Sequence, residues 1–324
     1  MILSVRAGKL LIGNLVSLIQ AISKINTYSQ TMIQNIYIIY NTSLFMEQLF
    51  EFLKRESVVH KKIEDTEICN QDIGTVKVIN LSYVYPNSNA FALKNINLSF
   101  EKGELAAIVG KNGSGKSTLV KIISGLYQPT MGIIQYDKMR SSLMPEEFYQ
   151  KNISVLFQDF VKYELTIREN IGLSDLSSQW EDEKIIKVLD NLGLDFLKTN
   201  NQYVLDTQLG NWFQEGRQLS GGQWQKIALA RTFFKKASIY ILDEPSAALD
   251  PVAEKEIFDY FVALSENNIS IFISHSLNAA RKANKIVVMK DGQVEDVGSH
   301  DVLLRRCQYY QELYYSEQYE DNDE

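Results

Sequence analysis

The first forty residues carry a long apolar pattern that polar residues interrupt. Between Leu10 and Tyr40 apolar residues dominate and no acidic residue occurs. Polar side chains nevertheless recur along this stretch, at Gln20, Lys24, Asn26, Gln30, Gln34 and Asn35. About thirty helical residues would reach roughly 45 Å, which is enough to cross a bilayer and project beyond it. The pattern therefore predicts one long helix, either an amphipathic helix of a soluble protein or a membrane span with one polar face.

Beyond residue 74 the pattern changes to short apolar runs of strand type that alternate with helical patterns. The predicted strands lie at residues 76–79, 105–109, 153–157, 239–242, 271–273 and 286–289. Helices are predicted to begin at Lys116, Gly222, Pro251 and Leu277. Such alternation predicts an α/β fold with a mainly parallel sheet, whose chemistry lies at the carboxyl ends of the strands. Residues 160–218 lack strong strand signals and are predicted to form an inserted helical subdomain.

The same patterns place a connection at residues 41–73 and a tail at residues 317–324. The connection holds a charged run from Glu47 to Glu67, and we expect it to be helical. The tail carries five acidic residues and no basic one, which predicts a solvated, disordered end. The chain thus divides into residues 1–40, the connection, a domain at residues 74–316 and the tail.

Charge and cysteine content restrict the classes of function. The 324 residues include 33 Lys and Arg against 40 Asp and Glu, a net charge of −7, so no bulk basic footprint for nucleic acid is present. Residues 1–62, in contrast, carry a net charge of +4, from seven basic and three acidic residues. Such a basic segment suits the cytoplasmic side of a membrane. Two widely separated cysteines, Cys69 and Cys307, indicate a reducing compartment.

A glycine-rich loop follows the predicted strand that ends at Val109. It reads Gly-Lys-Asn-Gly-Ser-Gly-Lys-Ser from Gly110 to Ser117 and opens a predicted helix. Glycines let backbone N–H groups converge on phosphates, and the start of the helix adds a favourable partial charge. The candidate nucleotide-binding residues of this loop are Gly110, Asn112, Gly113, Ser114, Gly115, Lys116, Ser117 and Thr118. Lys116 is expected to neutralise phosphate charge and Ser117 to hold Mg²⁺.

Two carboxylates follow the later apolar run at residues 239–242. Asp243 ends this predicted strand, so its side chain would emerge at the sheet edge and hold Mg²⁺ through water. Glu244 comes next, and we expect it to orient the water that attacks the γ-phosphate. By itself, an Asp-Glu pair after a strand is often no more than a solvated strand end.

The motif Leu-Ser-Gly-Gly-Gln-Trp-Gln at Leu219 to Gln225 follows the phosphate loop by about a hundred residues and precedes Asp243 by about twenty. This constellation resembles the nucleotide-binding domain of ABC transporters, a P-loop NTPase fold with a mainly parallel sheet, an antiparallel β edge and a helical subdomain. The resemblance implies that ATP bound by one subunit contacts this motif in a second copy, within a homodimer. The residues so implicated are Ser220, Gly221, Gly222 and Gln223.

The resemblance also suggests roles for residues outside these motifs. Gln158 matches the glutamine that contacts Mg²⁺ and the attacking water, and His275 follows a strand from which its imidazole could reach the γ-phosphate. Tyr85 matches the aromatic residue that stacks on adenine, although the neighbouring Tyr83 is an alternative. Asp250 matches a loop that crosses the dimer interface. The implied cofactors are ATP and Mg²⁺.

In detail, the segment from Gly210 to Gln225 resembles the nisin-type lantibiotic export ATPases. This family implies export of a modified precursor peptide across the bacterial plasma membrane, with the ATPase on the cytoplasmic side and the modifying enzymes as further partners. Residues 1–40 then become the last membrane helix of an exporter. One helix cannot enclose a path, so we expect the chain to be the carboxyl-terminal part of a longer protein.

Some features depart from the general exporter pattern, and other functions stay open. Trp224 stands where Arg, Lys or Gln is more usual, Ser276 where Arg is often found, and Asn284 where Asp is often found. The stretch before Leu219 lacks the Glu-Arg-Gly that often contacts the coupling helices. Alternatives are an exporter of lipid or drug, the ATPase subunit of an importer, and a stand-alone soluble ABC ATPase. The upstream helix argues against the importer, and the acidic composition argues against a partner that is nucleic acid.

Overall fold

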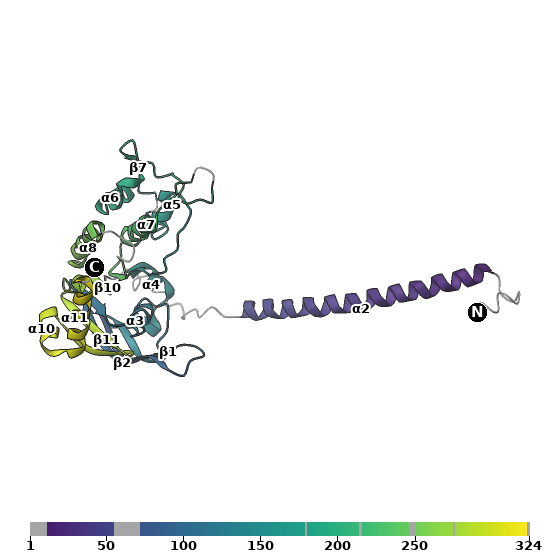
Figure 1. Ribbon diagram of the computed structural model, residues 1–324, viewed down its shortest axis with the longest axis horizontal. Helices are drawn as coiled ribbons and strands as arrows, with labels where there is room; N and C mark the ends of the chain where they lie inside the picture. Colours follow the sequence, from purple (N-terminus) through teal and green to yellow (C-terminus); the bar gives the residue numbers. More distant parts are fainter. Residues whose placement is uncertain are drawn as a thin grey trace. The chain divides into compact units, whose positions relative to one another are not determined.

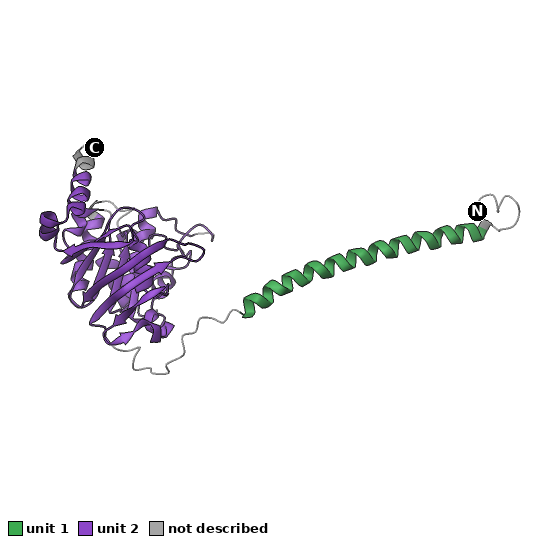
Figure 2. Cartoon of the chain, turned by 90° about the horizontal axis from the view of Figure 1, so that it is seen from below, with its two compact units in different colours: residues 1–59 green, residues 60–324 purple. Residues whose placement is uncertain are grey.

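The residues described in the computed structural model are 12–54, 72–178, 180–213, 216–245, 251–274 and 276–322. The chain divides into two compact units, residues 1–59 and residues 60–324, which Figure 2 colours separately. Each unit is described by itself.

The described part of unit 1 is the single helix α2 (Ile12–Lys54), which is 43 residues long (Figure 1). It passes Tyr40 without a break, so the predicted boundary between residues 40 and 41 is not marked by a helix end. Its large apolar side chains are exposed, with Ile39 at 68% and Phe45 at 71%. No helix within the described residues is both long enough and apolar enough to qualify as a candidate membrane span.

Unit 2 is built on a six-stranded sheet in which five neighbouring strands run parallel. In spatial order the strands are β12 (Gln293–Gly298), β11 (Lys285–Lys290), β3 (Leu105–Val109), β10 (Ile269–Ile273), β9 (Ile239–Asp243) and β6 (Ile153–Leu156). Only β12, at one edge, is antiparallel to its neighbour. The predicted mainly parallel sheet is therefore confirmed, and so is its antiparallel edge.

The inner strands are buried throughout and mainly apolar because both faces of the sheet are covered. In β3, Leu105, Ala107 and Val109 pack into one core, while Ala106 and Ile108 pack into the other. All five residues of β3, β9 and β10 are buried. Parallel strands covered on both faces need such continuous apolar runs, which explains why these strands were the clearest in the sequence.

A second, antiparallel sheet packs into the core that contains Ala106 and Ile108. Its strands, in spatial order, are β2 (Phe91–Glu101), β1 (Thr75–Val84), β4 (Met131–Tyr136) and β5 (Met139–Arg140). The sequence analysis assigned residues 76–79 to the mainly parallel sheet. The strand exists, but it pairs antiparallel with β2 and β4. Pairing partners depend on segments far apart in the chain, so local periodicity did not distinguish the two sheets.

Helices cover both faces of the six-stranded sheet, and their bounds follow. They are α3 (Lys116–Ile123), α4 (Glu146–Asn152), α5 (Ile167–Gly172), α6 (Asp182–Asn191), α7 (Gly221–Phe234), α8 (Pro251–Ser265), α9 (Leu277–Ala280), α10 (His300–Arg306) and α11 (Gln308–Asn322), with short 3₁₀ turns at Ser141–Leu143 and Asp195–Leu197. The predicted starts at Lys116, Pro251 and Leu277 agree with these bounds, whereas α7 begins one residue before the predicted Gly222.

The predicted helical subdomain at residues 160–218 contains α5 and α6, which both contact α7. It also contains a small antiparallel pair, β7 (Lys198–Thr199) and β8 (Gln202–Tyr203), that the sequence analysis did not expect. Figure 1 shows these elements gathered at one end of unit 2, away from β1 and β2. A capping box at Thr166 and Glu169 fixes the start of α5.

At the carboxyl end, α11 continues to Asn322. This differs from the disordered tail predicted from Glu317 onward. The Glu317 side chain explains part of the difference, because its Oε2 accepts a hydrogen bond of 2.7 Å from the backbone N–H of Leu277 at the start of α9. A carboxylate is stabilising at the start of a helix, and a count of charges cannot reveal such a contact.

Candidate functional site

The phosphate loop joins β3 to α3, and two of its glycines are required by close packing. A Cβ atom on Gly110 would lie 2.2 Å from the carbonyl oxygen of Met289, and one on Gly115 would lie 2.7 Å from Cδ2 of Leu93. Gly115 also has a φ of +99°, a left-handed conformation, as the residue before the first turn of α3. Only glycine satisfies both positions, so the loop packs closely against β11 and β2. Loops of this kind can turn their N–H groups toward an anion.

Lys116 lies buried beneath this loop. Its Nζ atom donates hydrogen bonds to the carbonyl oxygens of Gly110, at 2.7 Å, and Lys111, at 3.1 Å. Burial lowers the pKa of the Lys116 amino group, while the charges of Glu244 and Asp243 act in the opposite direction. The amino group and both carboxylates therefore share one electrostatic neighbourhood, at the edge where the parallel strands end.

Asp243 and Ser114 contribute buried polar atoms to the same place. Asp243 Oδ1 and Ser114 Oγ have no hydrogen-bond partner among the described residues. Burial raises the pKa of Asp243, and the hydroxyl of Ser117 opposes this rise. Buried polar atoms without partners are uncommon, and they are often explained by a group that binds there. A carboxylate beside a serine hydroxyl suits a hydrated Mg²⁺, and the Ser114 hydroxyl suits a phosphate oxygen.

The sheet register brings Glu244 and Gln158 together. Asp243 pairs with Ile273, and Leu242 pairs with Leu156, so β6, β9 and β10 end at the same edge. Glu244 follows β9, Gln158 follows β6, and Gln158 Nε2 donates a 2.7 Å hydrogen bond to Glu244 Oε2. Two residues that lie 86 positions apart thus meet beside the phosphate loop, as parallel strands require.

The structure distinguishes the two tyrosines proposed for adenine stacking. Tyr83 is 7% exposed, belongs to the core, and stacks on Tyr127 with ring centroids 5.5 Å apart. Tyr85 is 37% exposed, and its hydroxyl lies 2.9 Å from Thr118 Oγ1 in the first turn of α3. Tyr85 is therefore the tyrosine of the pair that presents an open ring beside the phosphate loop.

The motif at Leu219 to Gln225, the signature motif, opens α7 with a complete capping box. Ser220 is the residue before the first turn; its Oγ accepts from the Gln223 N–H, and its own N–H donates to Gln223 Oε1. This arrangement holds the helix start rigid, with Ser220 and Gly221 exposed to solvent. The side chain of Gln223, predicted to bind nucleotide, is engaged in the cap. Trp224, an unusual residue at this place, is buried in the core.

Two predicted site residues cannot be placed. His275 and Asp250 lie outside the described residues. Their neighbours are described: Ser274 Oγ donates to the Ser276 carbonyl oxygen at 3.0 Å, and Ser276 caps the start of α9.

Sequence analysis missed one functional candidate, Gln225. It is 3% exposed on α7, and its Nε2 donates to the carbonyl oxygens of Pro245, at 2.7 Å, and Glu244, at 3.4 Å. A signal was present, because Gln225 is a polar residue at a core position of a helix. Asn284 has a similar linking role, since its Oδ1 accepts from the N–H of Leu105 at the start of β3.

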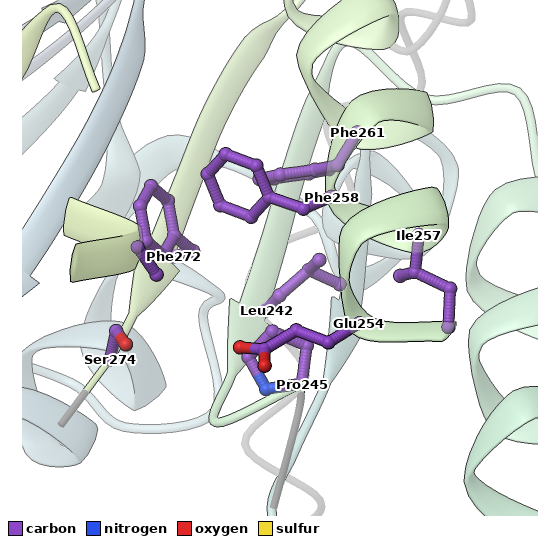
Figure 3. A pocket seen from close by; sticks show the side chains of 9 residues that line it. Leu242, Pro245, Glu254, Ile257, Phe258, Phe261, Phe272 and Ser274 are labelled. Atoms are coloured by element: carbon purple, nitrogen blue, oxygen red, sulfur yellow. The ribbon is translucent and has the colours of Figure 1, made fainter. Parts of the chain in front are cut away.

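A small cavity lies behind the turn that carries Glu244. It measures about 20 Å³ and is lined mainly by apolar side chains of α8 and the sheet, with Pro245 at one end (Figure 3). The lining residues are Leu242, Pro245, Glu254, Ile257, Phe258, Phe261, Phe272, Ser274 and Ala279. Such a volume holds about one water molecule, so this cavity is not the nucleotide site.

Comparisons with known proteins identify relatives of this chain. The family model described as ABC transporter matches residues 93–247. The chain is 99% identical over 324 residues to the nisin transport ATP-binding protein NisT of Lactococcus lactis subsp. lactis. The match covers 100% of this chain and 54% of that protein. It is 48% identical over 321 residues to the subtilin transport ATP-binding protein SpaT of Bacillus subtilis, covering 98% of this chain and 52% of that protein.

A solved structure, that of a bacterial Atm1-family ABC exporter with ATP bound, matches with a TM-score of 0.68 and 27% identity. The match covers 76% of this chain and 42% of that one. The chain spans about half the length of the curated relatives that it matches.

Proposed function

The chain belongs to the ABC transporter family, and from this premise we propose that it is the ATP-hydrolysing, carboxyl-terminal part of a bacterial peptide exporter. The observation that carries the ATPase proposal is the meeting of Lys116, Asp243 and Glu244 under one glycine-rich loop, with two buried polar atoms that have no partner among the described residues. A nucleotide phosphate and Mg²⁺ would supply those partners.

Each residue of the site has a proposed role in hydrolysis. Lys116 and the loop N–H groups would bind and neutralise the phosphates, and Ser117, Gln158 and Asp243 would hold Mg²⁺. When bound, Mg²⁺ screens the charge of the phosphate oxygens. Glu244 would accept a hydrogen bond from the attacking water and align it with the γ-phosphate. The hydrogen bond from Gln158 to Glu244 supports this assignment, because it orients the carboxylate.

We propose that the site is completed by a second copy of the chain. Ser220 and Gly221 are exposed at a rigid helix start, which suits an anion that arrives from outside the subunit. Asp250 and His275 are proposed to act at the same shared interface. The expected state is a homodimer with two equivalent ATP sites.

The proposed location is the bacterial plasma membrane, with unit 2 on the cytoplasmic side. The helix α2 supports this, because its apolar side chains are exposed over most of its length and no acidic residue precedes Glu47. Its first part is proposed as the last membrane helix of the exporter, with the polar residues between Gln20 and Asn35 facing other helices.

The proposed cargo is a nisin-like lantibiotic precursor peptide, and the modifying enzymes are proposed as further partners. This rests on relatives whose names specify nisin and subtilin transport. The test is ATPase activity of the chain joined to a complete membrane domain in lipid, measured with and without a lanthionine precursor peptide that carries its leader. A leaderless peptide is the matched control, and Glu244→Gln gives the background rate.

Stimulation by the leader-bearing peptide is the expected result. Activity that responds to lipids or small amphiphiles and ignores the peptide would contradict the cargo and leave the ATPase. No activity above the Glu244→Gln background under any condition would contradict the ATPase itself.

A further inference from the structure

We infer that Gln225 is a positioning residue for ATP hydrolysis, which acts by holding the backbone turn that carries Glu244. The inference rests on the proposed ATPase function and assigns the reaction a residue beyond those that touch nucleotide. It begins from the unusual backbone of Glu244, whose φ is +52°. Residues with a side chain seldom adopt this left-handed conformation, and they keep it only where the surroundings hold it in place.

Among the contacts of the described residues, three bear on the conformation of Glu244. Its N–H donates a hydrogen bond of 3.1 Å to the carbonyl oxygen of Ile273 at the end of β10. Its side chain accepts the hydrogen bond from Gln158. Its carbonyl oxygen, together with that of Pro245, faces the amide of Gln225, at 3.4 Å and 2.7 Å. The backbone N–H of Glu244 is thus held by β10, its side chain by Gln158 after β6, and the turn that follows it by Gln225 on α7.

The contact from Gln225 fixes the turn after Glu244. The apolar side of Pro245 closes the small cavity beneath α8 (Figure 3), so packing there restrains the ring but not the direction of the carbonyl group. Gln225 binds that carbonyl from α7 and is itself 3% exposed, so its side chain has little freedom. If this contact is lost, the turn can rotate toward an ordinary φ, and the Cβ atom of Glu244 then points elsewhere.

Rotation of Glu244 would move its carboxylate away from Gln158 and from the neighbourhood of Lys116. Misplacement of a catalytic group by about 1 Å can cost on the order of a hundredfold in rate. Binding of ATP, in contrast, depends on the loop from Gly110 to Ser117, which Gln225 does not contact in the described part of the chain. Loss of Gln225 should therefore lower kcat and spare nucleotide affinity.

The experiment uses Gln225→Met, which keeps the length of the side chain and removes its donor. In the chain joined to a complete membrane domain, kcat is expected to fall roughly ten- to a hundredfold, with the KM and the affinity for ATP unchanged. The matched control is Thr232→Val on the same helix, where a buried hydroxyl bonds only within α7 among the described contacts; its kcat should equal that of the wild type.

A double-mutant cycle separates positioning from general stability. If Gln225 acts through Glu244, Gln225→Met should cause little further loss in a Glu244→Gln background, measured as residual single-turnover hydrolysis. An equal fold-loss in both backgrounds, or a parallel loss of ATP affinity, would overturn the inference. Gln225→Leu has no donor in any protonation state; wild-type kcat in this variant would overturn the inference even if Gln225→Met failed to fold.

Failure of the proposed function would look different. A wild-type protein that hydrolyses no ATP would refute the ATPase itself. A fully active Gln225→Met variant with an inactive Glu244→Gln variant would refute only the role of Gln225.

Discussion

At the scale of single residues, burial around the phosphate loop disfavours the ionised forms of Lys116 and Asp243. Burial lowers the pKa of Lys116 and raises that of Asp243, which in both cases disfavours the ionised form. The two opposite charges lie close enough to offset part of this cost. Bound phosphate would compensate Lys116 and a divalent cation would compensate Asp243. The site is thus built to gain most from a ligand that carries both.

Lys235, directly after α7, is a half-buried amine away from this site. Its titration predicts a dependence of stability on pH. Its Nζ donates to the carbonyl oxygen of Ile153 at 2.6 Å. Burial lowers the pKa of Lys235 from its ordinary 10.5 to about 8. Between these values the unfolded chain binds more protons than the folded one, so the contribution of Lys235 to stability should rise with pH, by at most about 1.4 kcal/mol per pH unit.

The measurement is urea unfolding of the wild type and Lys235→Met at pH 7.5 and pH 9.5. Relative to the variant, the wild type should gain stability at the higher pH. Lys236→Met is the control, because its side chain is exposed and should give the same pH response as the wild type. An identical response of all three proteins would contradict the shift at Lys235.

At the scale of elements, side-chain caps stabilise the starts of three helices around the site. Capping boxes fix α5 and α7, and Ser276 caps α9. The start of α9 has a second partner, the Glu317 carboxylate on α11, which accepts from the Leu277 N–H. Leu277 follows His275 by two residues, so α11 restrains the chain next to a proposed catalytic position.

Removal of the Glu317 carboxylate should loosen this contact. We expect Glu317→Ala to lower the free energy of unfolding by about 1 kcal/mol, since a charged acceptor to one N–H is lost at a half-buried position. Glu312→Ala removes an exposed carboxylate from the same helix, where it bonds Gln308, and should cost about 0.3 kcal/mol. Urea unfolding of both variants tests the difference; equal losses would mean that the contact with α9 contributes nothing specific.

At the scale of the whole molecule, unit 2 carries the two parts of a proposed ATP site, the phosphate loop and the signature motif, at separate places on its surface. The phosphate loop lies at the edge of the parallel sheet, whereas the exposed Ser220 and Gly221 open α7 beside the helical subdomain. A homodimer would pair each loop with the signature motif of the other copy.

This arrangement predicts complementation between two inactive variants. Lys116→Ala damages the loop, and Gly221→Asp places a negative charge at the signature motif; each homodimer should lack ATPase activity. Co-expressed in equal amounts, the two chains should recover about a quarter of wild-type activity, because half of the dimers are mixed and each mixed dimer keeps one intact site. No recovery, with mixed dimers shown by two affinity tags, would indicate sites contained within one chain.

Much of this molecule was predictable because its strongest signals are local. The buried strands, the glycine loop and the starts of α3, α8 and α9 follow from apolar runs, glycine positions and capping residues within a few positions of each other. The order of the motifs then identified the family. The sequence by itself therefore determined the elements and the phosphate loop, and it supplied the basis for the proposed ATPase.

The tertiary structure alone decided how distant segments meet. It placed residues 76–79 in the antiparallel sheet, buried Tyr83 while exposing Tyr85, joined Glu317 of α11 to the start of α9, and set Gln225 against the turn of Glu244. Each of these outcomes depends on pairing or packing between residues far apart in the chain. Local periodicity and motif spacing carry no record of such pairings, because they are settled only when the separate elements pack into one core.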